Sequence, residues 1–497
     1  MPGEFGKEFS KNRSEAEIDT PVSCPQGDEG VKCDLYLRCA SAMGDYRLPS
    51  QASFRHSGNV LTRVAAILLT LWISLLAGIS SAGVATCTHT DFYGHVTTRA
   101  YDPLTDRLLA VAADPAHPSL SLDHAPARHE FGYDLLGRRT AAVVKSAAGT
   151  VLHSDAWSYD VQSRPLVQTS TTGTLRYAWD ATGTLAGVKS DTAGGYDLSY
   201  DYDALNRLAT VHHGQEGVDP ASYPLAAYGY DANGNLAGVS YANQVTHAYA
   251  YNTLNRLTGL AVERQPGGSG AIATPLQGYG YTLNLAGQRT HIAELGGRTI
   301  AHTYDALHRL TSETIGHAQG NAAPTPLGSI SYDYDENNNR LARNTQPQNT
   351  VGGTNLATLL PNQNHFYNER DQLDGDGYDA NGNTTSSLIT DHGSLGTTSA
   401  SDVYSFDNRL IRRERADGIT VDILYSTDGD RVAKWTEQGG LMRSIHRYLV
   451  DRLNPTGYAQ VLEEKDGTGQ LVARHLYGHD LIASDCTPIA QSPTPRP

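Results

Sequence analysis

The 497-residue sequence contains few cysteines, and their positions match no common metal module. Five cysteines are present, and none lies between Cys87 and Cys486. Cys24, Cys33 and Cys39 are separated by eight and five residues, which is not the spacing of paired zinc ligands. A disulfide among these three is expected only if the segment leaves the cytoplasm. We therefore predict no metal site and no cofactor.

Positive charge is also scarce. The chain has 38 basic and 53 acidic residues, and its net charge is −15. A general nucleic-acid binder needs a basic surface, so this class of partner is excluded. Among the basic residues, 31 are arginine and only 7 are lysine. This arginine excess is expected to have a structural cause.

Motifs of common enzymes are missing as well. The sequence has no GxSxG, HExxH, P-loop or CxxC motif. The adjacent pair His212 and His213 would point to opposite faces of a strand, which is poor for joint metal binding. Asp374 and Asp376 lack the ligand spacing of an EF-hand. We predict a non-enzymatic protein without catalytic residues.

One apolar run interrupts this polar chain. Residues 64–90 carry no charge, Arg55 and Arg63 precede them, and small residues follow the apolar centre at 80–85. That order is typical of a secretory signal. The 22 residues of 64–85 are also long enough to anchor the chain in a membrane, and a buried core helix is a third interpretation. The first two interpretations export the rest of the chain, because the basic residues lie on the N-terminal side.

These features predict four regions. Residues 1–63 form a polar, disordered extension, and 64–90 form one apolar helix that is a signal peptide or membrane anchor. Residues 91–484 form a β-array, and 485–497 form a Pro-rich tail without a strand pattern. The expected location is therefore secreted or at the cell surface, with membrane contact through 64–85 if the segment is not cleaved.

An internal repeat accounts for the unusual ratio of 28 tyrosines to 7 phenylalanines. Its pattern is Y-x-Y-D-x-x-(G/N)-R-L, as in residues 200–208, 249–257 and 302–310. With the second aromatic as marker, thirteen copies lie at positions 133, 159, 179, 202, 230, 251, 281, 304, 334, 367, 378, 406 and 425, about 24 residues apart on average. Self-similarity of this period indicates a repeat architecture.

Each copy reads as a β-hairpin. The Y-x-Y alternation places two aromatics on one face of a strand. Asp bonds the backbone ahead of it, and Gly or Asn three residues later tolerates a positive φ, so the segment turns. Arg-Leu then starts the next strand, and the arginine fork is expected to lie near the preceding Asp. Single hairpins are unstable in water, so neighbouring copies must pair into a longer sheet with an aromatic ladder.

The residues that carry this repeat signature are Tyr133, Asp134, Arg138, Tyr159, Asp160, Arg164, Tyr202, Asp203, Arg207, Tyr230, Asp231, Tyr251, Arg256, Tyr304, Asp305, Arg309, Tyr334, Asp335 and Arg340.

The pattern resembles the RHS/YD-repeat family of bacterial RHS and wall-associated proteins and, more distantly, the shell-forming parts of insecticidal toxin complexes and teneurins. Residues 457–464 and 475–482 also look like the late repeats that precede the RHS-associated core. The resemblance covers about residues 91–483. It implies an all-β fold in which tandem YD-repeat hairpins form a spiralling, curved sheet, as a partial RHS-type shell.

The resemblance also implies a function. Such shells enclose a C-terminal toxin and act in toxin delivery, bacterial competition or surface adhesion. This sequence lacks the RHS-associated core, its DPxG-type cleavage motif and the toxin, so we expect the repeat portion of a larger, truncated system. The leading expectation is an exported scaffold whose partner is a separately encoded RHS core or toxin cargo. The alternative is a cell-surface adhesin that binds glycan or cell-wall polymer through its tyrosines.

Overall fold

The computed structural model describes residues 31–34, 84–214, 224–265, 272–318, 324–351, 354–390 and 397–486. The chain divides into two compact units, residues 1–117 and 118–497. Most of the predicted extension, the apolar residues 64–83 and the tail from 487 lie outside the described residues. Within the described part, no helix is long and apolar enough to cross a membrane.

Two predicted boundaries need correction. Residues 85–90 form a β-strand, so the apolar helix predicted to reach residue 90 is wrong over this stretch. Residues 485 and 486, assigned to the tail, are the last two residues of a strand. In both places the backbone pairs with a neighbouring strand, and this pairing outweighs the local pattern from which the boundary was drawn.

The described residues of unit 1 form four antiparallel strands. They are β1 (Val31–Asp34), β2 (Ala85–Thr90), β3 (Val96–Tyr101) and β4 (Leu108–Ala112). Each strand pairs with the next. The short turn between β2 and β3 and the segment after β4 complete the unit.

Unit 2 begins with the short 3-10 helix η1 (Pro118–Ser121) and a long antiparallel sheet in which each strand from β5 to β22 pairs with the next. The strands are β5 (Arg128–Tyr133), β6 (Arg139–Lys145), β7 (Val151–Tyr159), β8 (Pro165–Ser170), β9 (Thr174–Trp179), β10 (Leu185–Ser190), β11 (Asp197–Tyr202), β12 (Leu208–His213), β13 (Ala226–Tyr230), β14 (Leu236–Tyr241), β15 (Val245–Tyr251), β16 (Leu257–Arg264), β17 (Thr274–Leu283), β18 (Arg289–Glu294), β19 (Arg298–Tyr304), β20 (Leu310–His317), β21 (Thr325–Tyr334) and β22 (Arg340–Pro347).

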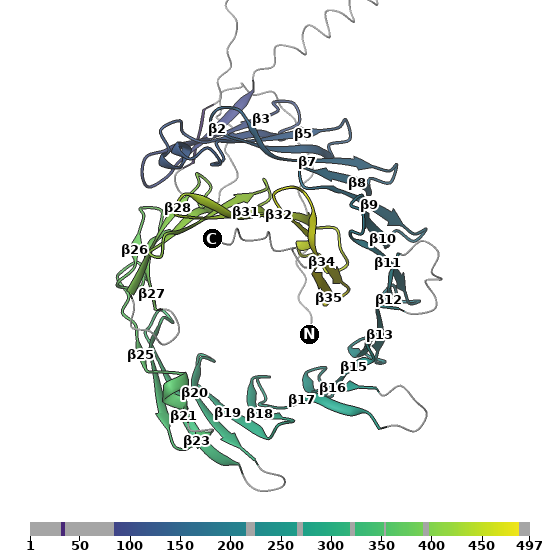
Figure 1. Cartoon of the computed structure of the whole chain (residues 1–497), viewed down its shortest axis with the longest axis vertical. Coiled ribbons are helices and arrows are strands. Elements are labelled where there is room, and N and C mark those ends of the chain that lie inside the picture. Colours follow the sequence, from purple (N-terminus) through teal and green to yellow (C-terminus); the bar gives the residue numbers. More distant parts are fainter. Residues whose placement is uncertain are drawn as a thin grey trace, which may run out of the picture. The chain divides into compact units, whose positions relative to one another are not determined.

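Shorter elements lead to a second sheet. β23 (Thr350–Val351), β24 (Thr354–Asn355), α2 (Leu356–Leu359) and β25 (Gln363–Asn364) follow β22. The ten strands of the second sheet again pair in chain order. They are β26 (Gly377–Tyr378), β27 (Thr384–Thr390), β28 (Thr397–Tyr404), β29 (Leu410–Arg415), β30 (Ile419–Tyr425), β31 (Arg431–Gln438), β32 (Leu441–Asp451), β33 (Gln460–Lys465), β34 (Leu471–Tyr477) and β35 (Leu481–Cys486). The predicted all-β fold of tandem hairpins in a curved sheet is confirmed (Figure 1).

The hairpin turns have one recurring construction. In the first copy of unit 2, Asp134 N donates to Arg138 O, and Gly137 N donates to Asp134 O. The residue before the arginine has a positive φ, +86° at Gly137 and +58° at Asn206. A type I turn followed by one left-handed residue closes a hairpin of this length. The predicted use of Gly or Asn three residues after Asp is therefore confirmed, although Ser163 and His308 also adopt this conformation.

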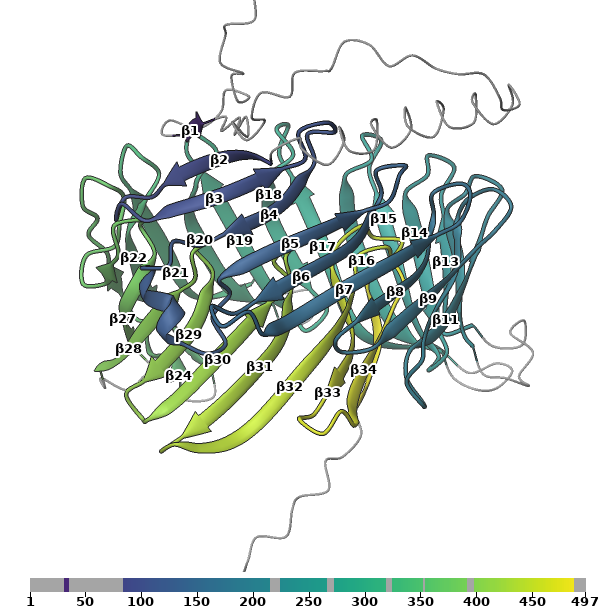
Figure 2. The same cartoon turned by 90° about the horizontal axis from the view of Figure 1, so that it is seen from above.

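The main core of unit 2 joins strands that are distant in sequence. Leu175, Leu198 and Val211 from β9, β11 and β12 are buried with Leu449 and Leu462 from β32 and β33. Figure 1 shows β32 and β34 on the concave side of β8–β11, and Figure 2 shows the strands of unit 2 side by side as a curved ribbon, with β31 and β32 next to β6 and β7. The last part of the ribbon thus packs against the first part.

Candidate functional site

The repeat signature forms a compact ion pair within each complete turn. In the first copy, Arg138 N donates to Asp134 Oδ1 at 2.9 Å, and Arg138 Nε donates to Asp134 Oδ2 at 2.6 Å. The same two bonds join the Asp and Arg of the copies at 160 and 164, 203 and 207, and 305 and 309. The predicted position of the arginine fork beside the preceding Asp is confirmed for these copies.

The same arginines also connect neighbouring copies. Arg138 Nη1 donates to Asp160 O at 3.0 Å, and its guanidinium lies 4.7 Å from the ring centre of Tyr159. The Tyr159 hydroxyl in turn donates to Arg139 O at 2.6 Å. Arg309 repeats the pattern, with its guanidinium 4.9 Å from the ring centre of Tyr334. Each arginine therefore closes its own turn and holds the next one.

The tyrosine ladder is built from these hydroxyl bonds. Tyrosines that end a strand donate to a backbone carbonyl of the preceding copy; they are Tyr159, Tyr202, Tyr230, Tyr251, Tyr304, Tyr334 and Tyr404. Burial raises the pKa of Tyr202 to about 12, so this hydroxyl stays a donor at neutral pH. Phenylalanine could not make this bond, which gives the high tyrosine content a physical cause. Tyr133 likewise is the last residue of its strand, β5.

Several copies replace the charged pair by amides, and here one predicted residue is wrong. Asn339, not Arg340, takes the position four residues after Asp335, and its Nδ2 donates to Asp335 Oδ2 at 2.9 Å. The Arg340 guanidinium lies 6.0 Å from the ring centre of Tyr332. The repeat pattern was aligned on Arg340, whereas the length of the turn places Asn339 at the position that arginine occupies in the other copies. Asn235 pairs with Asp231 in the same manner.

The remaining signature arginine and two markers also differ from expectation. Arg256 follows Asn252 in place of Asp, and its Nη1 donates to Leu285 O at 3.1 Å. The strand end predicted at Tyr281 lies at Leu283, and that predicted at Phe406 lies at Tyr404. In both cases the turn hydrogen bonds, which were not visible in the aromatic pattern, define the end of the strand.

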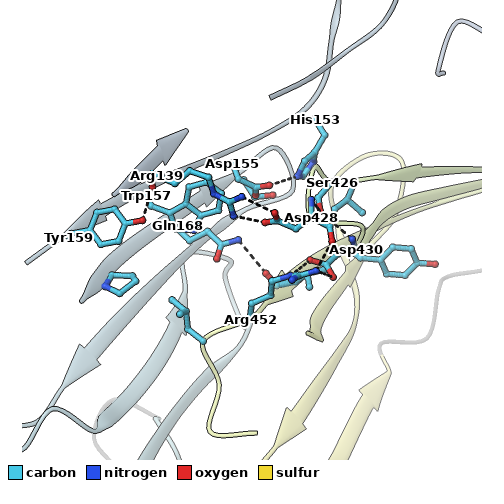
Figure 3. Close-up of a pocket in the computed structure, with 16 residues that line it drawn as sticks. Arg139, His153, Asp155, Trp157, Tyr159, Gln168, Ser426, Asp428, Asp430 and Arg452 are labelled. Atoms are coloured by element: carbon cyan, nitrogen blue, oxygen red, sulfur yellow. Dashed lines mark hydrogen bonds and ion pairs between the residues drawn. The ribbon is translucent and has the colours of Figure 1, made fainter. Parts of the chain in front are cut away.

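A cavity of about 190 Å³ lies where the first strands of unit 2 meet the last ones (Figure 3). It lies between β6–β8 and β31–β32. Arg139 from β6 forms two bonds with the carboxylate of Asp428, the shorter at 2.5 Å. Arg452 holds Asp430 through two further bonds of 2.5 and 2.7 Å. Two Arg–Asp pairs thus line the cavity, and the Arg139–Asp428 pair joins parts of the ribbon that are 289 residues apart.

The charges of this cavity are satisfied within the protein. Burial opposes ionisation of Asp428, but the Arg139 guanidinium outweighs it and lowers the pKa of the carboxyl. His153 and Asp155, both buried on β7, lie 2.9 Å apart. Gln168 Nε2 reaches Val450 O across the cavity at 3.4 Å. Polar groups that could bind a ligand are therefore engaged in holding the ribbon together.

Further along, buried polar groups continue this junction. Tyr177 OH donates to Asp451 Oδ1 at 2.9 Å, and burial raises the pKa of Asp451. Glu463 is 0% exposed and accepts bonds from Thr192 Oγ1 at 2.7 Å and from the backbone N of Tyr196 at 2.8 Å. We call the contacts of β6–β12 with the segment 428–465 the closing junction. Sequence reasoning missed it, because its partners lie more than 260 residues apart.

One row of residues has the composition of a hydrolase triad. His475 Nδ1 lies 2.9 Å from Ser484 Oγ, and its Nε2 lies 3.3 Å from Glu464 Oε1. His475 on β34 is directly opposite Ser484 on β35, and Glu464 on β33 is its diagonal neighbour, since Glu464 pairs with Ala473; none of the three lines the cavity described above. The row is explained by cross-strand polar pairing. The absence of enzymatic activity stays a prediction.

Comparison with known proteins gives little beyond this geometry. No family model matches the chain, and no curated protein matches it. Similar solved structures include the crystal structure of TcdB2-TccC3, with 16% identity over 81% of this chain and a TM-score of 0.43. The crystal structure of TcdB2-TccC3 without its hypervariable C-terminal region matches with 13% identity over 81% of this chain and a TM-score of 0.42.

The chain spans about a quarter of the length of these two neighbours, 24% and 27%. At such identity and TM-score the likeness carries no argument about function. Membership of the RHS/YD-repeat family therefore stays a prediction that the repeat itself supports.

Proposed function

We propose that this chain is an exported, non-enzymatic scaffold whose hairpins build part of the wall of a shell around a polypeptide cargo. Two sets of contacts carry the proposal. The first, the copy-to-copy lock, consists of the bonds by which a turn arginine binds both its own turn and the next one. The second is the closing junction. Arg138 binds Asp134 within its turn and Asp160 O in the next turn. Arg139 then binds Asp428 from the far end of the ribbon.

Away from the main core of unit 2, the copy-to-copy lock allows the sheet to grow hairpin by hairpin. Each link joins only neighbouring hairpins, as in other repeat arrays, whose stability is a sum of nearest-neighbour terms. The buried apolar cluster around Ile300, Ile315 and Ile330 is correspondingly small. A wall built in this way can be long, thin and curved, which suits enclosure better than catalysis.

The packing of the last strands against the first ones gives the curved sheet of unit 2 a distinct concave side. The strands β34 and β35 lie on the concave side of β10–β12 (Figure 1). The last described strand of the chain, β35, therefore ends on the concave side of unit 2, where a cargo that follows it would start. By the family resemblance, the cargo is a toxin, and export would use residues 64–85.

Protease protection tests this proposal. An unstructured reporter peptide with several trypsin sites is fused after residue 497 of the full chain, and its cleavage rate is measured. As a matched control, the same peptide is inserted after Leu295, whose side chain is exposed in the turn between β18 and β19, a turn that carries no Asp–Arg signature. We expect the C-terminal reporter to be cleaved at least tenfold more slowly. Equal cleavage rates would show that the concave side encloses nothing.

A further inference from the structure

Two histidines and one aspartate converge in unit 1. Asp91 and His95 belong to the turn between β2 and β3, and His117 belongs to the segment after β4. One ligand atom from each of these three side chains lies within 4.8 Å of the others. The His95 and His117 rings are 5.0 Å apart between their centres, and His95 Nδ1 is 3.5 Å from Asp91 Oδ2.

Backbone hydrogen bonds hold these side chains in place. Asp91 Oδ1 accepts from Tyr93 N at 2.9 Å and from His95 N at 2.8 Å. These bonds turn the other carboxylate oxygen, Oδ2, towards His95. The segment that carries His117 is fixed separately, since Asp114 accepts a bond from Val96 N at 3.0 Å. The two loops are therefore positioned independently of any metal.

One nitrogen in the cluster has no partner of its own. His95 Nδ1 is shielded from solvent and makes no hydrogen bond in the described structure. Its distance to Asp91 Oδ2 is too long for a good hydrogen bond. Buried polar atoms of native proteins are normally satisfied, and a water or an ion is the usual partner of an atom like this one.

We propose that Asp91, His95 and His117 bind one divalent transition-metal ion of the zinc type. Imidazole nitrogen and carboxylate oxygen are ligands of zinc, with bonds of about 2.0–2.2 Å. Ligand atoms around such an ion lie about 3.4 Å apart in tetrahedral geometry, so the side chains must close by roughly 1 Å. Water fills the remaining position. Two nitrogen ligands favour zinc, copper or nickel over calcium and magnesium.

The site would join the β2–β3 turn to the segment after β4. Bound metal would thus act as a clamp on unit 1, and the inference is independent of the proposed shell function. Sequence reasoning predicted no metal site, because His117 lies far from the Asp91-x3-His95 pair in the sequence and the two loops meet only in the fold.

Copper EPR and zinc titration of the tag-free full chain test the site. We expect wild type to bind one equivalent of Zn²⁺ more than the double variant H95Q/H117Q. Because both proteins share all other metal-binding residues, subtracting the two stoichiometries leaves only the binding at this site. With one equivalent of Cu²⁺, the wild-type spectrum should show coupling to two imidazole nitrogens, and H117Q should show one. The variant D91N should weaken Zn²⁺ binding at least about tenfold.

The control is H308N, which removes a histidine from an exposed turn of unit 2 where the left-handed conformation suits asparagine. It should bind Zn²⁺ as wild type does. Circular dichroism spectra show whether each variant is folded. Equal Zn²⁺ stoichiometry in wild type and folded H95Q/H117Q would overturn the proposal, as would a wild-type Cu²⁺ spectrum without nitrogen coupling from His95 and His117.

Discussion

Glu463 is expected to be the most sensitive single position of the closing junction. It is fully buried on β33 and accepts bonds from Ser190, Thr192 and Tyr196, all from the β10–β11 hairpin. Lys465 lies 3.3 Å from it and donates to Thr172 O at 2.8 Å. The carboxylate therefore joins two parts of the chain and neutralises a buried lysine.

The substitution Glu463→Gln keeps the shape but removes the charge. It replaces one acceptor oxygen by an NH₂ group, which cannot accept the present bonds, and leaves the buried Lys465 without its charged partner. Removal of one member of a buried ion pair costs about 3–5 kcal/mol. At 1.36 kcal/mol per tenfold change, the junction should open about 10²–10⁴ times more often.

Hydrogen exchange measured by mass spectrometry detects this opening. Peptides covering residues 192–200 should exchange faster in Glu463→Gln by this factor, while peptides from β17–β20 should be unchanged. The matched control is Glu464→Gln on the same strand, because Glu464 is half-buried and lies on the other face. It should alter exchange by less than tenfold. If both variants exchange alike, the carboxylate does not hold the junction, and the reasoning is wrong. Lys465→Met in the Glu463→Gln background should recover part of the protection, since it removes the unpaired charge.

Three further predictions concern the repeat and the cavity. Arg207→Lys should lower the free energy of unfolding by about 0.5–1 kcal/mol in a urea titration, because lysine cannot reproduce the planar stacking of the guanidinium 4.2 Å from the ring centre of Tyr230. Asn206→Val should cost about 1–2 kcal/mol, since the residue has φ +58°, whereas Asn206→Gly should be nearly neutral; equal losses would contradict a backbone cause. Asp428→Asn should cost about 1–3 kcal/mol at pH 7 through the bond from Arg139. Because the folded pKa of Asp428 is lowered, this stabilisation is present above the unfolded pKa of about 3.9 and is lost as pH falls through the folded value. Urea titrations from pH 7 to pH 2.5 should therefore show the variant and wild type converging, and a constant difference would refute the ionic origin.

Much of the local structure was predictable because its causes are local. The Asp134–Arg138 pair and the left-handed Gly137 lie within one turn, so their spacing is visible in the sequence. The misplaced repeat positions are those at which the residue types of the repeat pattern and the hydrogen bonds of the turn indicate different strand ends. At position 339 the Asn amide takes the place of the arginine and makes the equivalent bond to the Asp carboxylate. The repeat pattern was instead aligned on the adjacent Arg340. At Tyr404 the turn begins at Ser405, which the pattern of Tyr-Asp pairs could not indicate.

The sequence by itself thus determined the hairpin, its turn and the contact between neighbouring copies, because each depends on residues at most one repeat apart. Only the tertiary structure decided that Arg139 meets Asp428 and that Glu463 reaches Tyr196. The physical reason is curvature. Each hairpin adds a small twist to the next, and the accumulated twist, which no single repeat encodes, brings the distant end of the ribbon back to its beginning.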